Sequence, residues 1–303
     1  MTALGWGKII LLGEHAVVYG YPALAAALDR GVTIAPVPTP AGGPLRLDIA
    51  AWGLKIKAGD DHPVAHGLVA IADTLDIGRP ALSLLGDAQI PHSAGLGSSA
   101  ALAVAIARAL LTHAKRPLDP TTIGNAAGAS ESLLHGRASG IDVALAMAGG
   151  IGVYRKSTGL RPLAARGLRV LVGPSGSPRS TAAMVERIAD ATDSLPADER
   201  LAELGGLTDS GTAALLAGDL AALGSAMNRA HEILAGLGVS TPQLDSLCEA
   251  ARATGAHGAK LTGAGGGGAI IAIAPRDRES AILAEWKAVG VTGFVATVGA
   301  RSQ

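Results

Sequence analysis

The stretch from Pro91 to Ala100, PHSAGLGSSA, places glycines and serines where a loop is expected to enter a helix. Backbone amides at a helix N-terminus, reinforced by the helix dipole, bind anions such as phosphate. Paired serine hydroxyls at that point suit phosphate oxygens and a magnesium ion. The candidate phosphate-binding residues are Ser93, Ala94, Gly95, Leu96, Gly97, Ser98 and Ser99. The alternative is a glycine turn followed by a serine N-cap.

Two carboxylates follow at a spacing that suits metal and alcohol chemistry. Glu131 falls near the end of an expected helix, and Asp142 stands between the apolar residues Ile141 and Val143. A carboxylate in apolar surroundings is often kept ionised by a cation, for which Lys8 and magnesium are candidates. One carboxylate to hold a metal and one to orient or deprotonate an alcohol is what phosphoryl transfer requires. The alternatives are a helix N-cap for Asp142 and a solvated helix face for Glu131.

The N-terminal segment supplies a cation and a histidine. Lys8 precedes the apolar run Ile9–Leu12, which would carry its ammonium group inward, although a solvated lysine at a strand start is the alternative. His15 follows Glu14, and an isolated histidine there is most simply a satisfied buried residue.

Several common sites are absent from the sequence. No G-x-x-x-x-G-K-[ST] loop, H-E-x-x-H pair or G-x-S-x-G elbow occurs. The glycines from Gly263 to Gly268 follow Lys260 and precede an expected strand, whereas a dinucleotide site needs a strand before its glycines and a helix after them. A P-loop, a zinc hydrolase, an α/β-hydrolase and a Rossmann site are therefore disfavoured.

Composition limits the partners. The 303 residues include 25 basic and 25 acidic ones, so the formal net charge is zero, and only seven are aromatic. Such a chain lacks the basic surface and stacking platforms of a nucleic-acid binder. Charged residues interrupt every apolar stretch, so no membrane span or signal peptide is expected, and the lone Cys248 excludes an internal disulfide. These features predict a soluble cytoplasmic protein. The 42 glycines indicate that bare backbone approaches the ligands.

Periodicity predicts an α+β chain with two domains, residues 1–160 and 161–303. In the first half we expect strands near 9–12, 45–49, 54–56 and 82–85, and helices over 62–75, 98–113 and 121–135. Thr121 or Thr122 is the expected N-cap of the last of these helices and Gly136 its stop. In the second half we expect strands over 168–172, 269–274 and 293–298, and helices over 181–192, 200–217, 220–237, 243–254 and 278–289.

Taken together, these stretches resemble the GHMP small-molecule kinases, and within them the mevalonate kinases. The middle loop is similar to the family's P-x-x-x-G-L-G-S-S-A-A motif, and KLTGAGGGG at 260–268 to its C-terminal glycine motif. The segment 7–20, GKIILLGEHAVVYG, resembles the N-terminal signature of the mevalonate kinases almost residue for residue. His135–Gly136 with 139–142 resembles their H-G-x-P-S-G-x-D segment, and further matches lie at 178–181 and 238–242.

The resemblance implies a ribosomal-protein-like N-terminal domain and a ferredoxin-like C-terminal domain, with the active site between them. It implies ATP- and Mg²⁺-dependent phosphorylation of the C5 hydroxyl of mevalonate, by a homodimer. Asp142 would be the catalytic base and Lys8 would polarise the hydroxyl and the γ-phosphate, while Ser99 and Glu131 would hold magnesium. Gly95, Leu96, Gly97 and Ser98 would wrap the ATP phosphates. Residues implied at the substrate are Glu14, His15, Thr181, Gly263 and Ala264.

Two positions depart from the family pattern. Trp6 replaces the proline that usually precedes Gly-Lys, and Ala138 replaces the proline of the catalytic loop. Neither change removes a functional side chain, although the first alters the shape beside Lys8. Phosphomevalonate kinase and homoserine kinase remain alternatives, and a non-catalytic ligand sensor is a more distant one.

Overall fold

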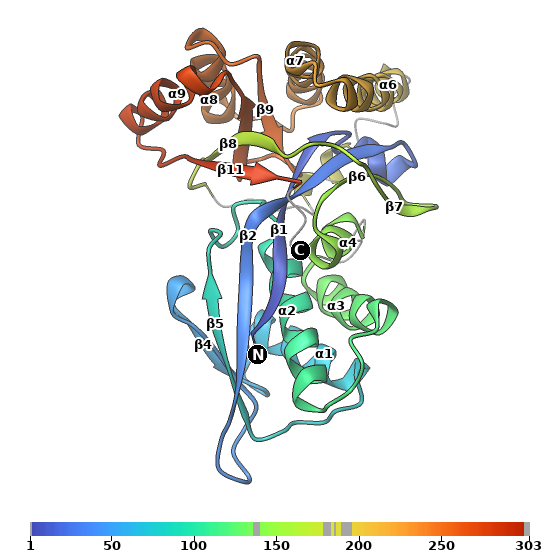
Figure 1. The fold of residues 1–303 in the computed structure, drawn as a ribbon, viewed down its shortest axis with the longest axis vertical. Coiled ribbons are helices and arrows are strands. Elements are labelled where there is room, and N and C mark those ends of the chain that lie inside the picture. The colour runs from blue at the N-terminus through green and yellow to red at the C-terminus, as the bar shows by residue number, and fades with distance from the viewer. Residues whose placement is uncertain (1, 136–139, 178–182, 185, 189–195, 300–303) are drawn as a thin grey trace. The chain divides into compact units, whose positions relative to one another are not determined.

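The computed structural model describes residues 2–135, 140–177, 183–184, 186–188 and 196–299 (Figure 1). The chain forms two compact units, each assembled from several segments. The first consists of Met1–Gly7, Arg30–His92 and Gly97–Ala148; the second consists of Lys8–Asp29, Ser93–Leu96 and Gly149–Gln303. Strands β1 (Ala3–Leu12) and β2 (Ala23–Pro38) each contribute residues to both units. The predicted domain limits describe continuous halves of the chain and stay a prediction.

The first unit combines a sheet with helices that are rich in apolar and small residues. Strand β3 (Arg46–Ile49) pairs antiparallel with β4 (Leu54–Lys57) and parallel with β5 (Leu82–Ala88), which pairs antiparallel with the later residues of β2. A short 3-10 helix, η2 (Ala50–Trp52), joins β3 to β4. The helices are α1 (Pro63–Thr74), α2 (Ser98–His113), α3 (Pro120–His135) and α4 (Ile141–Ala148).

Helix α2 is the centre of this unit. Most of its residues are buried, and it packs against α1, α3 and α4 (Figure 1). Alanine at so many positions allows neighbouring helices to approach closely. Arg108, in the middle of α2, donates to the carbonyl oxygens of Leu4 and Met147, which ties β1 and the end of α4 to this helix. These contacts anchor the middle of α2, the helix that the predicted phosphate loop enters.

The second unit contains an antiparallel sheet in the order β11-β8-β10-β9. These strands are β8 (Leu168–Pro174), β9 (Gly258–Thr262), β10 (Ala269–Ile273) and β11 (Phe294–Val298). Strands β9 and β10 consist entirely of buried residues. Helices α7 (Leu220–Gly236) and α8 (Pro242–Ala253) pack on β9, and α9 (Arg276–Ala288) packs on β8 (Figure 1). Helix α6 (Pro196–Ala217) lies against α7.

The remaining elements of the second unit include the turn that follows β1. Residues 23–26 of β2 pair with β6 (Ile151–Arg155), which pairs with β7 (Gly159–Pro162). The 3-10 helix η1 (Ala16–Tyr19) follows directly on Glu14 and His15. Glu14 therefore lies in the tight connection between β1 and η1.

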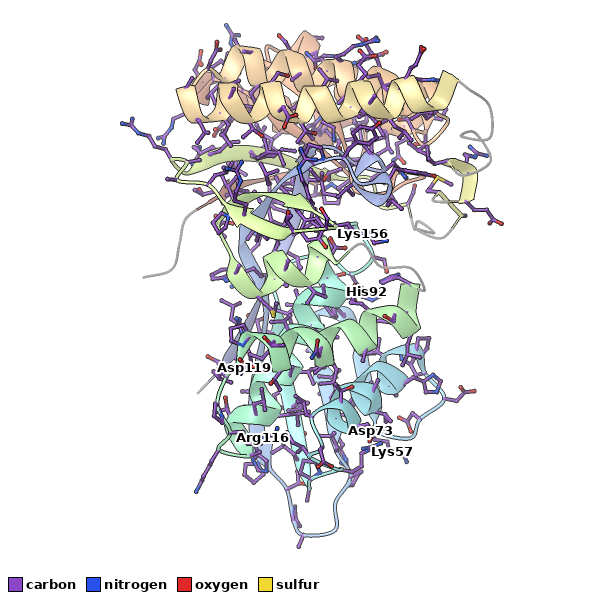
Figure 2. All side chains as sticks on the ribbon, turned by 90° about the vertical axis from the view of Figure 1, so that its right-hand side faces the viewer. Lys57, Asp73, His92, Arg116, Asp119 and Lys156 are labelled. Carbon is purple, nitrogen blue, oxygen red and sulfur yellow. The ribbon has the colours of Figure 1, made fainter. Side chains whose placement is uncertain are left out.

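The structure confirms the α+β class and the predicted elements that fall on described residues. The predicted N-cap of α3 is wrong, because the carboxylate of Asp119 accepts from the Thr122 N–H at 2.7 Å and Pro120 begins the helix (Figure 2). Strands β6, β7 and β9 were not expected. The predicted stop Gly136 and most of the helix over 181–192 lie outside the described residues. Of the helices that are described, none combines the length and apolar character that crossing a bilayer requires.

Candidate active site

Lys8 is buried within β1, in the second unit, with only 2% of its surface exposed. Its backbone N–H donates to the Leu96 carbonyl at 2.8 Å, and its Nζ lies 3.5 Å from the Gly95 carbonyl oxygen. The alternative of a solvated lysine is therefore wrong. The contacts attach the predicted phosphate loop to β1 and place an ammonium group beside it.

The phosphate loop enters α2 through Gly97, which has the left-handed φ of 71° at the N-cap position. A non-glycine residue would be strained there. No side chain among the described residues caps α2, and Ser98 is the first helical residue, so the alternative of a serine N-cap is wrong. The N–H groups of the first helical turn have no partner within a helix. Amide groups of this kind suit an anion.

Ser99 and Glu131, the predicted metal ligands, share a neighbour in the first unit. Ser99 Oγ lies 3.2 Å from His135 Nε2, and Glu131 Oε2 lies 3.9 Å from the same nitrogen. Glu131 is buried, so a solvated helix face is wrong for this residue. Within the described ranges, no group of three histidine, cysteine, aspartate or glutamate side chains could hold a metal. The two oxygen donors fit Mg²⁺, which takes few protein ligands and keeps water and phosphate ligands.

Asp142 is the second residue of α4, also in the first unit. Helix α4 begins at Ile141, and the Ala144 N–H donates to the Gly140 carbonyl at 3.0 Å. Asp142 is therefore inside the first turn, and the N-cap alternative is wrong. The side chain is partly exposed, whereas Ile141 and Val143 on either side are buried. This arrangement fixes the backbone of Asp142 through the packing of its neighbours.

Glu14 and His15, predicted to line the substrate pocket, are both buried in the second unit. The Glu14 carboxylate forms an ion pair with the ammonium group of Lys260, a residue that the motif reading did not single out. His15 Nε2 lies 2.9 Å from the Ala264 carbonyl oxygen. Burial raises the pKa of Glu14, and the positive charges of Lys260 and Lys8 oppose this effect. Thr181 lies outside the described residues.

The C-terminal glycine motif forms a loop of left-handed backbone between β9 and β10. Gly263 and each glycine from 265 to 268 have positive φ. At Gly265 an added Cβ would lie 2.1 Å from the Val239 carbonyl oxygen, and the next N–H, that of Gly266, donates to this oxygen at 2.8 Å. Only glycine fits this combination of φ and close approach. The Lys260–Gly268 segment is thereby held against residue 239 and, through His15, against the turn after β1.

A hollow of about 480 Å³ in the first unit was not predicted from the sequence. It is formed by residues 51–52 and 88–92. The ring centroid of Trp52 lies 5.2 Å from that of His92, and Trp52 donates from Nε1 to the Ile90 carbonyl at 3.0 Å. Figure 2 labels His92. Partial burial and the nearby His62 lower the pKa of His92. The scarcity of tryptophan in this chain is the signal that could have indicated Trp52.

The structure thus gathers the predicted residues into two groups. Lys8, Glu14, His15, the loop Ser93–Leu96, Gly263 and Ala264 belong to the second unit. Gly97, Ser98, Ser99, Glu131 and Asp142 belong to the first. Each group therefore lies within one unit.

Comparison with known proteins identifies the family. The model of the GHMP kinases N-terminal domain matches residues 50–150, and that of the GHMP kinases C-terminal domain matches 212–292. The mevalonate kinase of Thermococcus sibiricus is 35% identical over 93% of this chain and 91% of its own length. The chain belongs to the mevalonate kinase family. Membership in this family accounts for all three glycine-containing motifs at once.

Solved structures of the mevalonate kinase family have the same fold. The Methanococcus jannaschii enzyme has a TM-score of 0.86 at 27% identity, covering 98% of each chain. The L. major enzyme, solved in complex with R-mevalonate, has a TM-score of 0.85 at 28% identity and covers 100% of this chain and 97% of its own. The α+β architecture described above is therefore the mevalonate kinase fold.

Proposed function

We propose that this protein transfers the γ-phosphoryl group of ATP to the C5 hydroxyl of mevalonate, giving 5-phosphomevalonate and ADP. The observation that carries the proposal is the attachment of the Ser93–Leu96 loop to buried Lys8, directly before the uncapped start of α2. This arrangement supplies amide groups and an ammonium group to a polyphosphate. The choice of acceptor rests on relatives named mevalonate kinase and on the R-mevalonate complex of the L. major enzyme.

The proposed reaction depends on charge stabilisation and alignment. Phosphoryl transfer has a loose transition state, in which negative charge is spread over the transferred oxygens. Lys8 and the amides at residues 95–99 would stabilise this charge because they are fixed before the substrate binds. Asp142 would orient the C5 hydroxyl and accept its proton as the bond from oxygen to phosphorus forms and the bond to ADP breaks.

Ser99 and Glu131 are the proposed magnesium ligands. Their hydroxyl and carboxylate oxygens both lie beside His135 Nε2, so they are near enough to one point to share an ion once the ring turns away. Oxygen donors of this kind, completed by phosphate and water, are those that Mg²⁺ prefers. When bound, Mg²⁺ would neutralise charge on the ATP phosphates.

The hollow at residues 51–52 and 88–92 is the proposed site of the nucleotide base. Pro91 and His92 immediately precede Ser93 in the chain, so this hollow is covalently continuous with the phosphate loop. The Trp52 ring offers an apolar face, and the lowered pKa of His92 favours its uncharged form at neutral pH. A neutral aromatic wall suits a purine.

Assembly and location are also proposals. The family resemblance predicts a homodimer, which sedimentation velocity would test. The composition predicts a cytoplasmic protein, which fractionation of the source cells would test.

The function is tested with purified protein, ATP, Mg²⁺ and a panel of acceptors. Mevalonate, phosphomevalonate, homoserine and galactose are supplied separately, and ADP release is measured with omission of acceptor as the control. We expect mevalonate to give the highest kcat/KM by at least tenfold. Higher kcat/KM with phosphomevalonate or homoserine would assign the chain to another GHMP kinase activity, and no release with any acceptor would favour a ligand sensor.

A further inference from the structure

Glu14 and Lys260 form an ion pair whose two side chains are both completely buried. The Lys260 ammonium donates to Glu14 Oε1 and also to the Leu261 carbonyl oxygen. The proposed phosphoryl transfer assigns no step to Lys260. The resemblance to the family had placed Glu14 at the substrate, yet its Oε1 faces a lysine in the protein interior.

This ion pair is one of three contacts that join the end of β1 to the end of β9. Thr262 Oγ1 bonds both backbone groups of Ile10, Lys260 bonds Glu14, and the Ala264 carbonyl lies beside His15 Nε2. Lys260 and Thr262 are two residues apart on β9, and side chains at that spacing point to the same side of a strand. The contacts therefore form a continuous seam between the N-terminal motif (residues 7–20) and the C-terminal glycine motif (residues 260–268).

The ion pair lies at the point of this seam where the backbone is least regular. Gly13 has φ of 95° and His15 has φ of 61°, a left-handed value that is uncommon for histidine. Glu14 is the residue between them. The buried ion pair fixes the side chain of Glu14 between these two left-handed residues.

Lys8 is a second positive charge near Glu14. The charge of Lys8 is felt at Glu14, together with the larger effect of Lys260. Glu14 thus lies within electrostatic reach of Lys8 as well as of its ion-pair partner Lys260. Removing Lys260 would leave the buried Glu14 carboxylate without its ion-pair partner, and removing Glu14 would leave the buried Lys260 ammonium group without its partner. Uncompensated buried charges of this kind are costly.

We propose that Glu14 and Lys260 are positioning residues, which hold the turn Gly13–His15 and the glycine loop in register so that Lys8 and His15 are correctly placed. Neither side chain contacts the substrate. This inference rests on the proposed phosphoryl transfer, but it concerns residues of the second unit alone.

The test is a double-mutant cycle of Glu14→Gln, Lys260→Gln and the double variant. Each single variant leaves unbalanced charge, so we expect kcat to fall at least about tenfold while KM for ATP changes less than about threefold. The double variant is neutral and can form an amide–amide hydrogen bond, so we expect its kcat to return to within about threefold of the wild type. A substrate contact by Glu14 predicts instead a raised KM for mevalonate that the double variant does not recover, which would overturn the proposal.

A second measurement does not depend on turnover. Amide hydrogen exchange at residues 13–17 and 263–268 should accelerate in each single variant and slow again in the double variant. Unchanged exchange in folded single variants would contradict the positioning role. If the wild type phosphorylates no acceptor, the proposed function fails and the exchange data still decide the role of the ion pair. If a single variant does not fold, recovery by the double variant alone remains the test.

The matched control is the Arg169–Glu279 ion pair, which joins β8 to α9 in the same unit. Glu279→Gln should lower the midpoint of thermal unfolding and leave kcat within about twofold, because the pair joins half-exposed Arg169 to buried Glu279 on elements outside the two motifs. A loss of kcat in this control equal to that of Lys260→Gln would show that any broken ion pair of this unit has the same effect, and the proposal would be wrong.

Discussion

The hydroxyl group of Thr262 accepts a hydrogen bond from the Ile10 N–H at 2.9 Å and donates one to the Ile10 carbonyl at 3.1 Å. Both residues are buried. The Thr262 side chain on β9 thus makes the two hydrogen bonds that a neighbouring strand's backbone would otherwise make to Ile10 on β1. This contact connects the N-terminal motif to the C-terminal glycine motif in the second unit.

Replacing Thr262 by valine should test how much this contact contributes to the free energy of unfolding. Thr262→Val keeps the shape but leaves the N–H and carbonyl of Ile10 buried without the hydroxyl, so we expect a loss of about 1–3 kcal/mol in the free energy of unfolding. Urea unfolding measures the change. Thr262→Ser retains the hydroxyl and should lose about 1 kcal/mol or less. Equal losses in the two variants would show that the methyl group, and not the hydroxyl, matters.

Asp142→Ala should nearly abolish turnover, because the C5 hydroxyl would lose the group that orients it and accepts its proton. A loss of about 10²- to 10⁴-fold in kcat is typical for such a group. The affinity for ATP, measured by titration calorimetry, should stay within a few-fold. Asp119→Ala is the control: it removes the N-cap of α3 and should lower stability by about 1 kcal/mol without changing kcat. Near-normal turnover of Asp142→Ala would contradict the assignment.

Ser99→Ala and Glu131→Gln should each raise the Mg²⁺ concentration that gives half-maximal activity, by about tenfold, the effect of a contact of about 1.4 kcal/mol. The measurement is a magnesium titration at fixed ATP. Ser132→Ala serves as the control, because this serine on the same helix as Glu131 is exposed and donates to the Gly128 carbonyl. An unchanged magnesium requirement in both site variants would exclude them as ligands.

Trp52→Ala should weaken ATP binding because the hollow would lose its aromatic wall. We expect KM for ATP to rise about tenfold, consistent with about 1–3 kcal/mol for the stacking of a base on an aromatic ring, and kcat to change little. Trp52→Phe retains an apolar ring and should recover most of the affinity. If KM for ATP is unaffected and only stability falls, the base binds elsewhere.

Stability should fall as the pH is lowered below 6.5, because His231 is buried in its neutral form. Its Nδ1 accepts from the Leu261 N–H at 3.3 Å and its Nε2 lies 3.1 Å from Asp245 Oδ1. Burial, and to a smaller extent the charge of Lys260, lowers the pKa of His231 to about 4. Between pH 6.5 and 4 the unfolded chain binds a proton that the folded chain does not, so the contribution of this group falls by up to about 3 kcal/mol.

Urea unfolding of the wild type and His231→Asn at several pH values measures this effect. The asparagine keeps an acceptor for the Leu261 N–H and cannot titrate, so we expect a flatter dependence on pH in this range. His113→Gln is the control, because His113 is exposed at the end of α2 and its loss should leave the dependence unchanged. A wild-type slope in His231→Asn would contradict the role of His231.

Local residue chemistry was sufficient to predict much of this protein. Alternation predicted β3 and β4, and the spacing of apolar residues predicted α1 and α2, because these elements follow from short-range patterns. The Pro91–Ala100 stretch indicated an anion site, since glycines before a helix leave amide groups available. Family membership followed from three motifs, each readable without coordinates.

Only the tertiary structure decided which partners these residues have. The burial of Glu131 depends on packing that no local pattern encodes, and the Trp52 hollow is formed by segments distant in sequence. The Glu14–Lys260 ion pair joins residues 246 positions apart, so the sequence around Glu14 does not indicate that Lys260 is its partner. The sequence alone therefore determined the family, whereas folding decided which charged groups are buried and which neutralise one another in the interior.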